Sequence, residues 1–229
     1  MITIHHLEQS RSMRILWLLE ELGTPYQIKH YQRDPVTSLA PPELLQVHPL
    51  GKSPIIEDGD ITLPETGAIV EYLIGKYDQG QIGAPMRPER GSREEVDYLH
   101  WIHFAEGTAM PPLVMSLVMS KVSEAKMPFF AKPIANGIVQ RVRGAVIDRN
   151  IQTQLDFVEK SLEGHDYMVG NHLTGADILM SFPLEAAAAR AGAAQGRPNL
   201  KRFLATIHAR PAYLAALKKA GPYDFGPQD

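Results

Sequence analysis

The chain has 229 residues, of which 44% are hydrophobic and 21% charged, with a formal net charge of −3, so we expect one large or two small globular domains and no nucleic-acid partner. The absence of cysteine excludes disulfides, thiolate metal sites and a cysteine nucleophile. The sequence contains no run of 18 apolar residues, so we expect no membrane-spanning helix. Its start does not resemble a signal peptide. We therefore expect a cytoplasmic protein that does not bind membranes.

Residues 1–80 alternate strand and helix signals. A polar–apolar alternation opens the chain, and a helical stripe that includes Ile15 and Leu18 follows and ends at Gly23 and Pro25. Asp58-Gly59-Asp60 favours a tight reversal between two short strands. The expected elements are strands at 1–6, 26–31, 54–57 and 61–63 and helices at 12–22, 42–47 and 65–77.

The remaining residues show only helical patterns. A Gly- and Pro-rich stretch near residues 78–91 predicts a linker. Long helical stretches follow at 89–121, broken or kinked at residues 110–112, and at 134–162. Thr174 and Asp177 match a capping box, and two short helices are expected at 198–208 and 211–219. The sequence therefore predicts a small α/β domain at 1–80 and an all-helical domain at 88–229.

Two motifs suggest other chemistries and are set aside. The segment Gly51-Lys52-Ser53 resembles the end of a phosphate-binding loop, but Gln46 stands where the first glycine should be and Pro54 blocks the helix. The spacing His100-x-x-His103-x-x-Glu106 could place three metal ligands on one helical face. Polar side chains at this spacing are also common on an amphipathic helix, so we expect no metal.

Three segments together resemble the glutathione S-transferase family. They are HLEQSRS at 6–12, HPLGKSPI at 48–55 and PET at 64–66. The stretches SRSMRILWLLEELGTPY, WIHFAEGTAMPPL and TGADILM extend the resemblance over nearly the whole chain, and they are similar to a bacterial and fungal serine-type or atypical subgroup. The resemblance implies an N-terminal thioredoxin-like domain, with the order βαβαββα, followed by a helical bundle.

The resemblance implies that the loop at 48–54 binds the middle of glutathione. The family's proline at the position of Pro54 is cis, and the residue before it, here Ser53 instead of the usual valine, pairs its main chain with the cysteinyl part. His48 replaces the family's asparagine, and Lys52 would offer charge near the glycyl carboxylate. Taken alone, this segment could be an ordinary loop.

The resemblance also implies that Glu65 and Thr66 hold the γ-glutamyl group. Thr66 would bond its carboxylate at a helix N-terminus, where backbone N–H groups favour anions, and Glu65 would pair with its ammonium. The same two residues are also good helix-capping chemistry with no ligand.

The family stabilises the glutathione thiolate with a Tyr, Ser or Cys in the first helix turn. Because this chain has no cysteine and no tyrosine before Gly23, a serine remains. We expect Ser10 to donate to the sulfur, with Ser12 or a backbone N–H as alternatives, and helix capping explains either serine without catalysis. Arg11 is either a further cation near the thiolate or a surface residue.

The helical domain is expected to supply the acceptor pocket. The predicted wall comprises Leu7, Phe104, Thr108 and residues 110–117, with Met115 and Met119 able to adapt their shape. The resemblance implies a homodimeric enzyme that conjugates glutathione, its co-substrate, to small hydrophobic electrophiles. A glutathione-dependent reductase of organic hydroperoxides and a non-catalytic binding module remain open.

Overall fold

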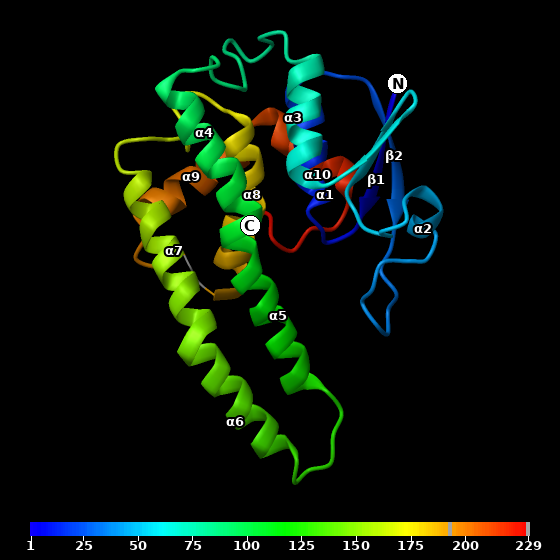
Figure 1. The fold of residues 1–229 in the computed structure, drawn as a ribbon, viewed down its shortest axis with the longest axis vertical. Helices are drawn as coiled ribbons and strands as arrows, with labels where there is room; N and C mark the ends of the chain where they lie inside the picture. Colours follow the sequence, from blue (N-terminus) through cyan, green and yellow to red (C-terminus); the bar gives the residue numbers. More distant parts are fainter. Residues whose placement is uncertain (192–193, 228–229) are drawn as a thin grey trace.

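The N-terminal third of the chain forms a four-stranded sheet in the computed structural model, which describes residues 1–191 and 194–227 (Figure 1). The spatial order is β2-β1-β3-β4, with β1 parallel to β2 and antiparallel to β3, and β3 antiparallel to β4. This order is that of a thioredoxin-like domain. The elements are β1 (Ile2–Leu7), α1 (Ser12–Glu21), β2 (Tyr26–Tyr31), α2 (Leu44–Val47), β3 (Ile55–Asp58), β4 (Ile61–Pro64) and α3 (Thr66–Tyr77).

Helix α1 joins the sheet to the helices that follow it. Nine of its ten residues are buried, which is the pattern of a helix covered on all sides. The ring of Trp17 packs edge-on against Tyr213 at 5.4 Å between centroids, and Glu21 forms an ion pair with Arg210 at 2.5 Å. The hydrophobic core is therefore continuous across the expected domain boundary, and the division at 80 and 88 stays a prediction.

The segment between α3 and the next helix contains no helix or strand but is anchored. The Met86 N–H donates to the Asp78 carboxylate at 2.6 Å, and the Met86 carbonyl accepts from the Gly175 N–H at 2.9 Å. The Met86 side chain is buried. The expected linker is thus a fixed connection on the helical part.

Helices make up the rest of the described chain. The helix predicted from residue 89 begins at Arg93 instead, because the Ser92 hydroxyl accepts from the Glu95 N–H at 3.0 Å and caps the first turn. The elements are α4 (Arg93–Phe104), η1 (Ala105–Ala109), α5 (Met110–Glu124), α6 (Lys132–Val142), η2 (Arg143–Ile147), α7 (Asp148–Ser161), α8 (Gly175–Ala191), α9 (Pro198–His208) and α10 (Pro211–Ala220).

The break expected near residues 110–112 is a change of helix type. The segments α4, η1 and α5 follow one another without a gap, and η1 is a π-helical turn. Pro111 and Pro112 have no N–H to donate to carbonyls one turn earlier, so the preceding turn widens while the helix continues. A second π-helical turn, η2, joins α6 to α7.

The capping box before α8 differs from its expected form. The Asp177 carboxylate accepts from the Thr174 N–H at 2.7 Å as predicted, but the Thr174 hydroxyl donates to the same carboxylate at 2.9 Å. Asp177 also accepts from the Met168 N–H at 2.7 Å. Burial raises the pKa of Asp177 to about 6, although these three donors oppose the rise.

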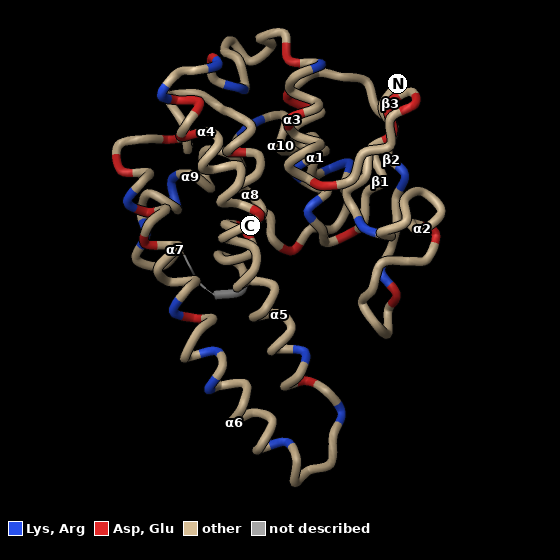
Figure 2. Tube along the Cα trace, in the orientation of Figure 1, with Lys and Arg blue, Asp and Glu red and all other residues tan. Residues whose placement is uncertain are grey.

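The lower ends of α5 and α6 extend beyond the other elements in Figure 1. Phe129 and Phe130 in the loop between them are 88% and 66% exposed. Figure 2 shows that Lys and Arg predominate over Asp and Glu on this hairpin. None of the described helices combines the length and apolar character needed to cross a membrane.

Candidate functional site

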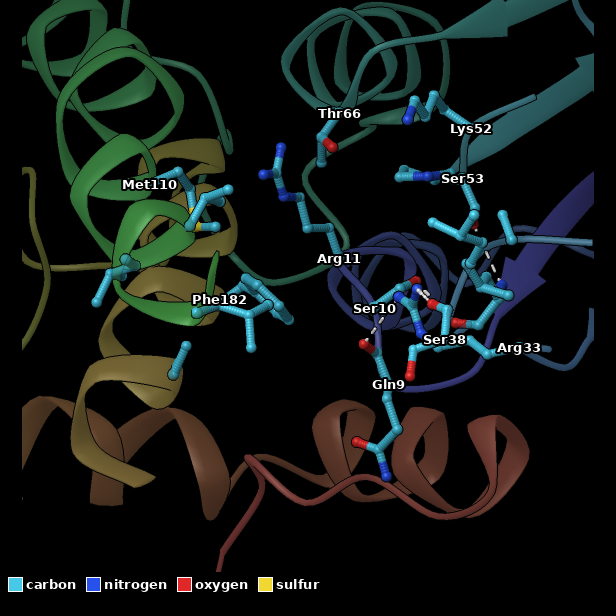
Figure 3. Close-up of a pocket in the computed structure, with 18 of the residues that line it drawn as sticks. Gln9, Ser10, Arg11, Arg33, Ser38, Lys52, Ser53, Thr66, Met110 and Phe182 are labelled. Atoms are coloured by element: carbon cyan, nitrogen blue, oxygen red, sulfur yellow. Dashed lines mark hydrogen bonds between the residues drawn. The ribbon is translucent and has the colours of Figure 1, made fainter. Parts of the chain in front are cut away.

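A cavity of about 490 Å³ lies where the loops of the sheet face α5, α8 and the C-terminal segment (Figure 3). One half is polar and comes from the N-terminal third. The other half is apolar and comes mainly from the helical part, with Leu7 of β1. The polar half includes Gln9, Ser10, Arg11, Arg33, Ser38, Lys52, Ser53, Glu65 and Thr66.

Backbone strain is concentrated around this cavity. Among the described residues, the non-glycine positions with positive φ are Gln9 (50°), Ser38 (60°) and Glu65 (72°), and all three line the cavity. Non-glycine residues in this region of φ are uncommon and cluster at functional sites. The distribution of strain therefore marks the cavity as a functional site independently of any motif.

Ser10 and Ser12 occupy different positions in the turn that begins α1. Ser10 lines the cavity, whereas Ser12 is fully buried behind it and does not line it. The two hydroxyl oxygens lie 2.7 Å apart, and the Ser10 hydroxyl also donates to the Leu7 carbonyl at 2.7 Å. Of the two predicted serines, only Ser10 faces a ligand space.

His6 holds Ser12 from behind. Burial, aided by the nearby charge of His30, lowers the pKa of His6 to about 4, so the imidazole is neutral at pH 7. Its Nε2 donates to the Ala220 carbonyl at 3.2 Å, which leaves Nδ1 to accept from the Ser12 hydroxyl at 2.8 Å. The sequence did not predict this role of His6, because a single histidine in an alternating strand does not indicate a partner for Ser12.

The loop before β3 is tied to the end of β1. The Ser53–Pro54 peptide bond is cis, as the resemblance predicts. The Ser53 hydroxyl donates to the His5 carbonyl at 2.9 Å and accepts from the Leu7 N–H at 3.2 Å. These bonds continue the β1–β3 contact past its last register pair, His5 with Ile55, and they engage a side chain that valine lacks.

The remaining predicted polar residues lie as follows. Thr66 is the first residue of α3 and is 5% exposed, with Glu65 directly before it. Lys52 has an exposed side chain at the cavity. His48 does not line the cavity, and its Nδ1 accepts from the Leu50 N–H at 3.3 Å.

The apolar half differs in part from the predicted wall. Met110, Leu113, Val114 and Leu117 of α5 and the predicted Leu7 line the cavity, as the pattern suggested. Phe104 and Thr108 lie outside it, on a shallow hollow of α4 and η1 that they share with His103. No sequence pattern predicted the distant wall residues Phe182, Ala186 and Phe225, which the fold brings in from α8 and the C-terminal segment.

Arg11 links the cavity to η1. Its Nη1 donates to the Glu106 carboxylate at 2.9 Å, and the buried Arg14 donates to the other oxygen of the same carboxylate. His100 instead packs against the ring of Phe104 at 5.6 Å between centroids. The three side chains of the possible metal motif therefore do not converge, and the described residues contain no cluster that could hold a metal ion.

This geometry suits an anionic ligand that reacts with an apolar one. The N-termini of α1 and α3 both open on the cavity and favour negative charge. Ser10 offers a hydroxyl at the first, and Thr66 offers one at the second. The apolar wall faces them and can receive a second, hydrophobic molecule.

Comparisons with known proteins cover almost the whole chain. The model of the glutathione S-transferase N-terminal domain matches residues 1–74, and that of the C-terminal domain matches residues 118–211. Glutathione S-transferase 1 of Saccharomyces cerevisiae is 35% identical over 227 residues, covering 96% of this chain and 95% of the relative. Glutathione S-transferase 3 of Schizosaccharomyces pombe is 36% identical over 220 residues, covering 96% and 88%. A crystal structure of a glutathione S-transferase from Actinobacillus pleuropneumoniae is 35% identical, with a TM-score of 0.78 over 98% of this chain and 95% of that one.

Proposed function

This chain belongs to the glutathione S-transferase family, and from that premise we propose that it conjugates the glutathione thiolate to small hydrophobic electrophiles in the cavity beside α1. The observation that carries the proposal is the position of Ser10. Ser10 lies at the N-terminus of α1 and lines the same cavity as the N-terminus of α3, which also favours anions, and the apolar wall, which suits an electrophile. A homodimer and a cytoplasmic location complete the proposal.

In the proposed complex, glutathione lies extended along the polar half of the cavity. Thr66 and the free N–H groups of α3 receive the γ-glutamyl carboxylate, and Glu65 receives its ammonium. The main chain of Ser53 pairs with the cysteinyl part, since its side chain is already engaged with β1. Lys52 faces the glycyl carboxylate.

The sulfur then lies at the first turn of α1. A free thiol has a pKa of about 8.5, and lowering it by about two units requires roughly 3 kcal/mol of preferential thiolate binding. A hydrogen bond to a charged group contributes about 1.5–3 kcal/mol, and the helix N-terminus contributes more. The Ser10 hydroxyl supplies that bond by turning from the Leu7 carbonyl to the sulfur, and it forms no covalent bond itself.

Calorimetry with glutathione tests the binding half of the proposal. We expect binding to the native chain, and Thr66→Ala should weaken it by about 1–3 kcal/mol because a buried charged group loses its partner. Thr62→Ala on the exposed face of β4 is the matched control and should bind as the native chain does. Equal affinity of native chain and Thr66→Ala would contradict this placement of the γ-glutamyl group.

Turnover tests the catalytic half. We expect the protein to conjugate glutathione to 1-chloro-2,4-dinitrobenzene. The absorbance of the product measures the rate. Cumene hydroperoxide, assayed in parallel, separates a transferase from a hydroperoxide reductase. Glutathione binding without turnover of either compound would identify a binding module and reject the enzyme.

A further inference from the structure

A carboxylate shared by two guanidinium groups lies beside the cavity, which Arg11, one of the two arginines, lines. Arg11 Nη1 donates to one oxygen of Glu106 at 2.9 Å, and Arg14 donates to the other. Burial lowers the pKa of Arg14 and Glu106 opposes that change, but a guanidinium stays charged in proteins. Two positive charges and one negative charge therefore leave this cluster with a net charge of +1.

The excess positive charge is accessible from the cavity through Arg11. The Arg14 side chain is 1% exposed, whereas that of Arg11 is 36% exposed and lines the cavity. Figure 3 shows the Arg11 side chain extending from the Ser10 turn toward Met110, with its guanidinium between Met110 and Thr66. Arg11 is therefore directed to the apolar wall, away from the Ser10 hydroxyl.

Arg11 is also the lining cation that the proposed glutathione complex leaves unused. Arg33 donates to the carbonyls of Ser38 at 3.1 Å and Gln9 at 3.3 Å, so it holds the strained loops in place. In the proposed complex, Lys52 binds the glycyl carboxylate of glutathione, and the anionic Glu65 binds its ammonium. Among the residues that the structure describes, none accepts a hydrogen bond from Nε or Nη2 of Arg11.

The wall beside Arg11 carries a second source of positive potential. The Arg14 guanidinium lies 5.5 Å from the centre of the Phe182 ring, and Phe182 lines the apolar half. A cation behind an apolar wall acts in a low-dielectric setting, where its attraction for an anion is stronger than in water. An acceptor lying on this wall is therefore close to two positively charged guanidinium groups. The single negative charge of Glu106 balances only one of them.

We propose that the preferred acceptor of this cavity is an apolar electrophile that carries a carboxylate, which Arg11 binds while the apolar body lies against Met110 and Phe182. This inference rests on the proposed function and names the acceptor class of the same site. A planar guanidinium with two free donor positions suits a carboxylate. An α,β-unsaturated ketone with a carboxylate at its far end fits this description.

The reaction with such an acceptor needs no further reagent. The thiolate sulfur forms a bond to the β-carbon, and the electron pair of the carbon–carbon double bond moves to give an enolate oxygen. The α-carbon then takes a proton from solvent and the carbonyl is restored. Nothing leaves, and the carboxylate bound to Arg11 remains unchanged.

The test compares ethacrynic acid, an unsaturated ketone with a carboxylate, with its methyl ester. We expect the native protein to prefer the acid by about tenfold in kcat/KM. Arg11→Gln should lower this acid-to-ester ratio at least tenfold, chiefly through the KM for the acid, and Arg11→Lys should restore part of it. Arg93→Gln, which removes an exposed cation paired with Asp97, is the control and should keep the native ratio.

Glu106→Gln should change the acid-to-ester ratio in the direction opposite to Arg11→Gln. It removes the anion that competes for both guanidinium groups, so the acid-to-ester ratio should rise at least threefold. Circular dichroism verifies that each variant is folded. A native ratio near one, or a ratio that neither Arg11→Gln nor Glu106→Gln changes, would overturn the proposal.

A binding measurement separates this inference from the proposed function. Calorimetry is performed with the saturated, unreactive analogue of the acid on the protein loaded with S-methylglutathione. We expect binding that weakens at least tenfold in Arg11→Gln. Failure of the protein to bind S-methylglutathione at all would reject the proposed function, whereas normal loading with equal binding of the acid and ester analogues would reject only the acceptor class.

Discussion

The proton of the Ser10 hydroxyl is controlled by a short chain of buried groups. Because neutral His6 donates to the Ala220 carbonyl through Nε2, its Nδ1 accepts a hydrogen bond from the Ser12 hydroxyl. Ser12 then accepts rather than donates toward Ser10, which also accepts from the Ser12 N–H at 3.2 Å. The Ser10 proton is therefore directed to neutral oxygens, and an adjacent thiolate would compete with them through a stronger, charge-assisted bond.

At this scale we expect Ser10→Ala to raise the pKa of bound glutathione. Loss of one hydrogen bond to the thiolate, worth about 1.5–3 kcal/mol, corresponds to a rise of roughly one to two units. Ultraviolet titration of the thiolate in the complex measures it directly.

Two serine variants serve as comparisons for this titration. Ser161→Ala removes a hydroxyl that donates only within α7 and should leave the titration as in the native chain. Ser12→Ala should have a smaller effect than Ser10→Ala, since Ser12 does not line the cavity. A normal titration in Ser10→Ala would transfer the role to Ser12 or a backbone N–H, and the Ser12→Ala titration separates these two.

At the scale of elements, Asp58 fastens the β3–β4 hairpin to α3. Its carboxylate accepts from the hydroxyls of Tyr72 at 2.8 Å and Tyr77 at 2.6 Å and from Lys76 at 2.7 Å. Burial alone would raise the pKa of Asp58, but Lys76 and the two tyrosines together lower it to about 2. The hairpin precedes Glu65 and Thr66, so this cluster also supports the proposed γ-glutamyl site of the cavity.

The lowered pKa of Asp58 predicts a contribution to acid stability. The native pKa of about 2 lies below the ordinary value of 3.8, so the unfolded chain binds a proton more readily. The contribution is therefore present above pH 4 and is lost as the pH falls from about 4 to about 2. The free energy of unfolding, measured with urea across this pH range, should decline less steeply with falling pH in Asp58→Asn than in the native chain.

The matched control is Asp60→Asn in the same hairpin turn, where the side chain is exposed. Its pH profile should follow that of the native chain. Parallel profiles for the native chain and Asp58→Asn would show that the cluster does not depend on ionisation of the carboxylate.

At the scale of the whole molecule, the continuous core indicates one folding unit, and the exposed apolar side chains indicate a surface for association. The core joins the sheet to the helices through α1, so we regard one chain as a single folding unit. Val96 and Leu99 on α4 and Phe157 on α7 remain partly exposed at 59%, 38% and 43%. Exposed apolar surface of this kind is common at sites of protein association.

The proposed homodimer predicts a particle of about twice the chain mass of 25.4 kDa in light scattering. Its thermal midpoint should rise with protein concentration, because association stabilises only the folded state. A 25.4 kDa particle at micromolar concentration, with a midpoint independent of concentration, would reject the dimer.

Sequence reasoning reached the fold because its signals are local. The alternation of β1, the Gly23 stop after α1 and the Asp-Gly turn at residues 58–59 each depend on neighbours in the chain. Much of the polar half lies in loops that the resemblance matches, but Arg33 and Ser38 come from the loop after β2, which no motif marked. Phe182 and Phe225 could not be predicted, since their position in the wall depends on how α8 and the last segment pack against α5.

The π-helical turn η1 has a consequence for how this protein could diversify. Each residue of a regular helix turns the next side chain by about 100°. One extra residue in a regular helix would therefore rotate every later side chain, but a π-helical turn takes up the extra residue without that rotation. Deleting one residue from Ala105–Ala109 would thus give a regular turn and leave Met110 and the wall residues after it facing the cavity. A change of one residue in this turn therefore alters the surroundings of Glu106, the partner of Arg11, while the apolar wall keeps its orientation.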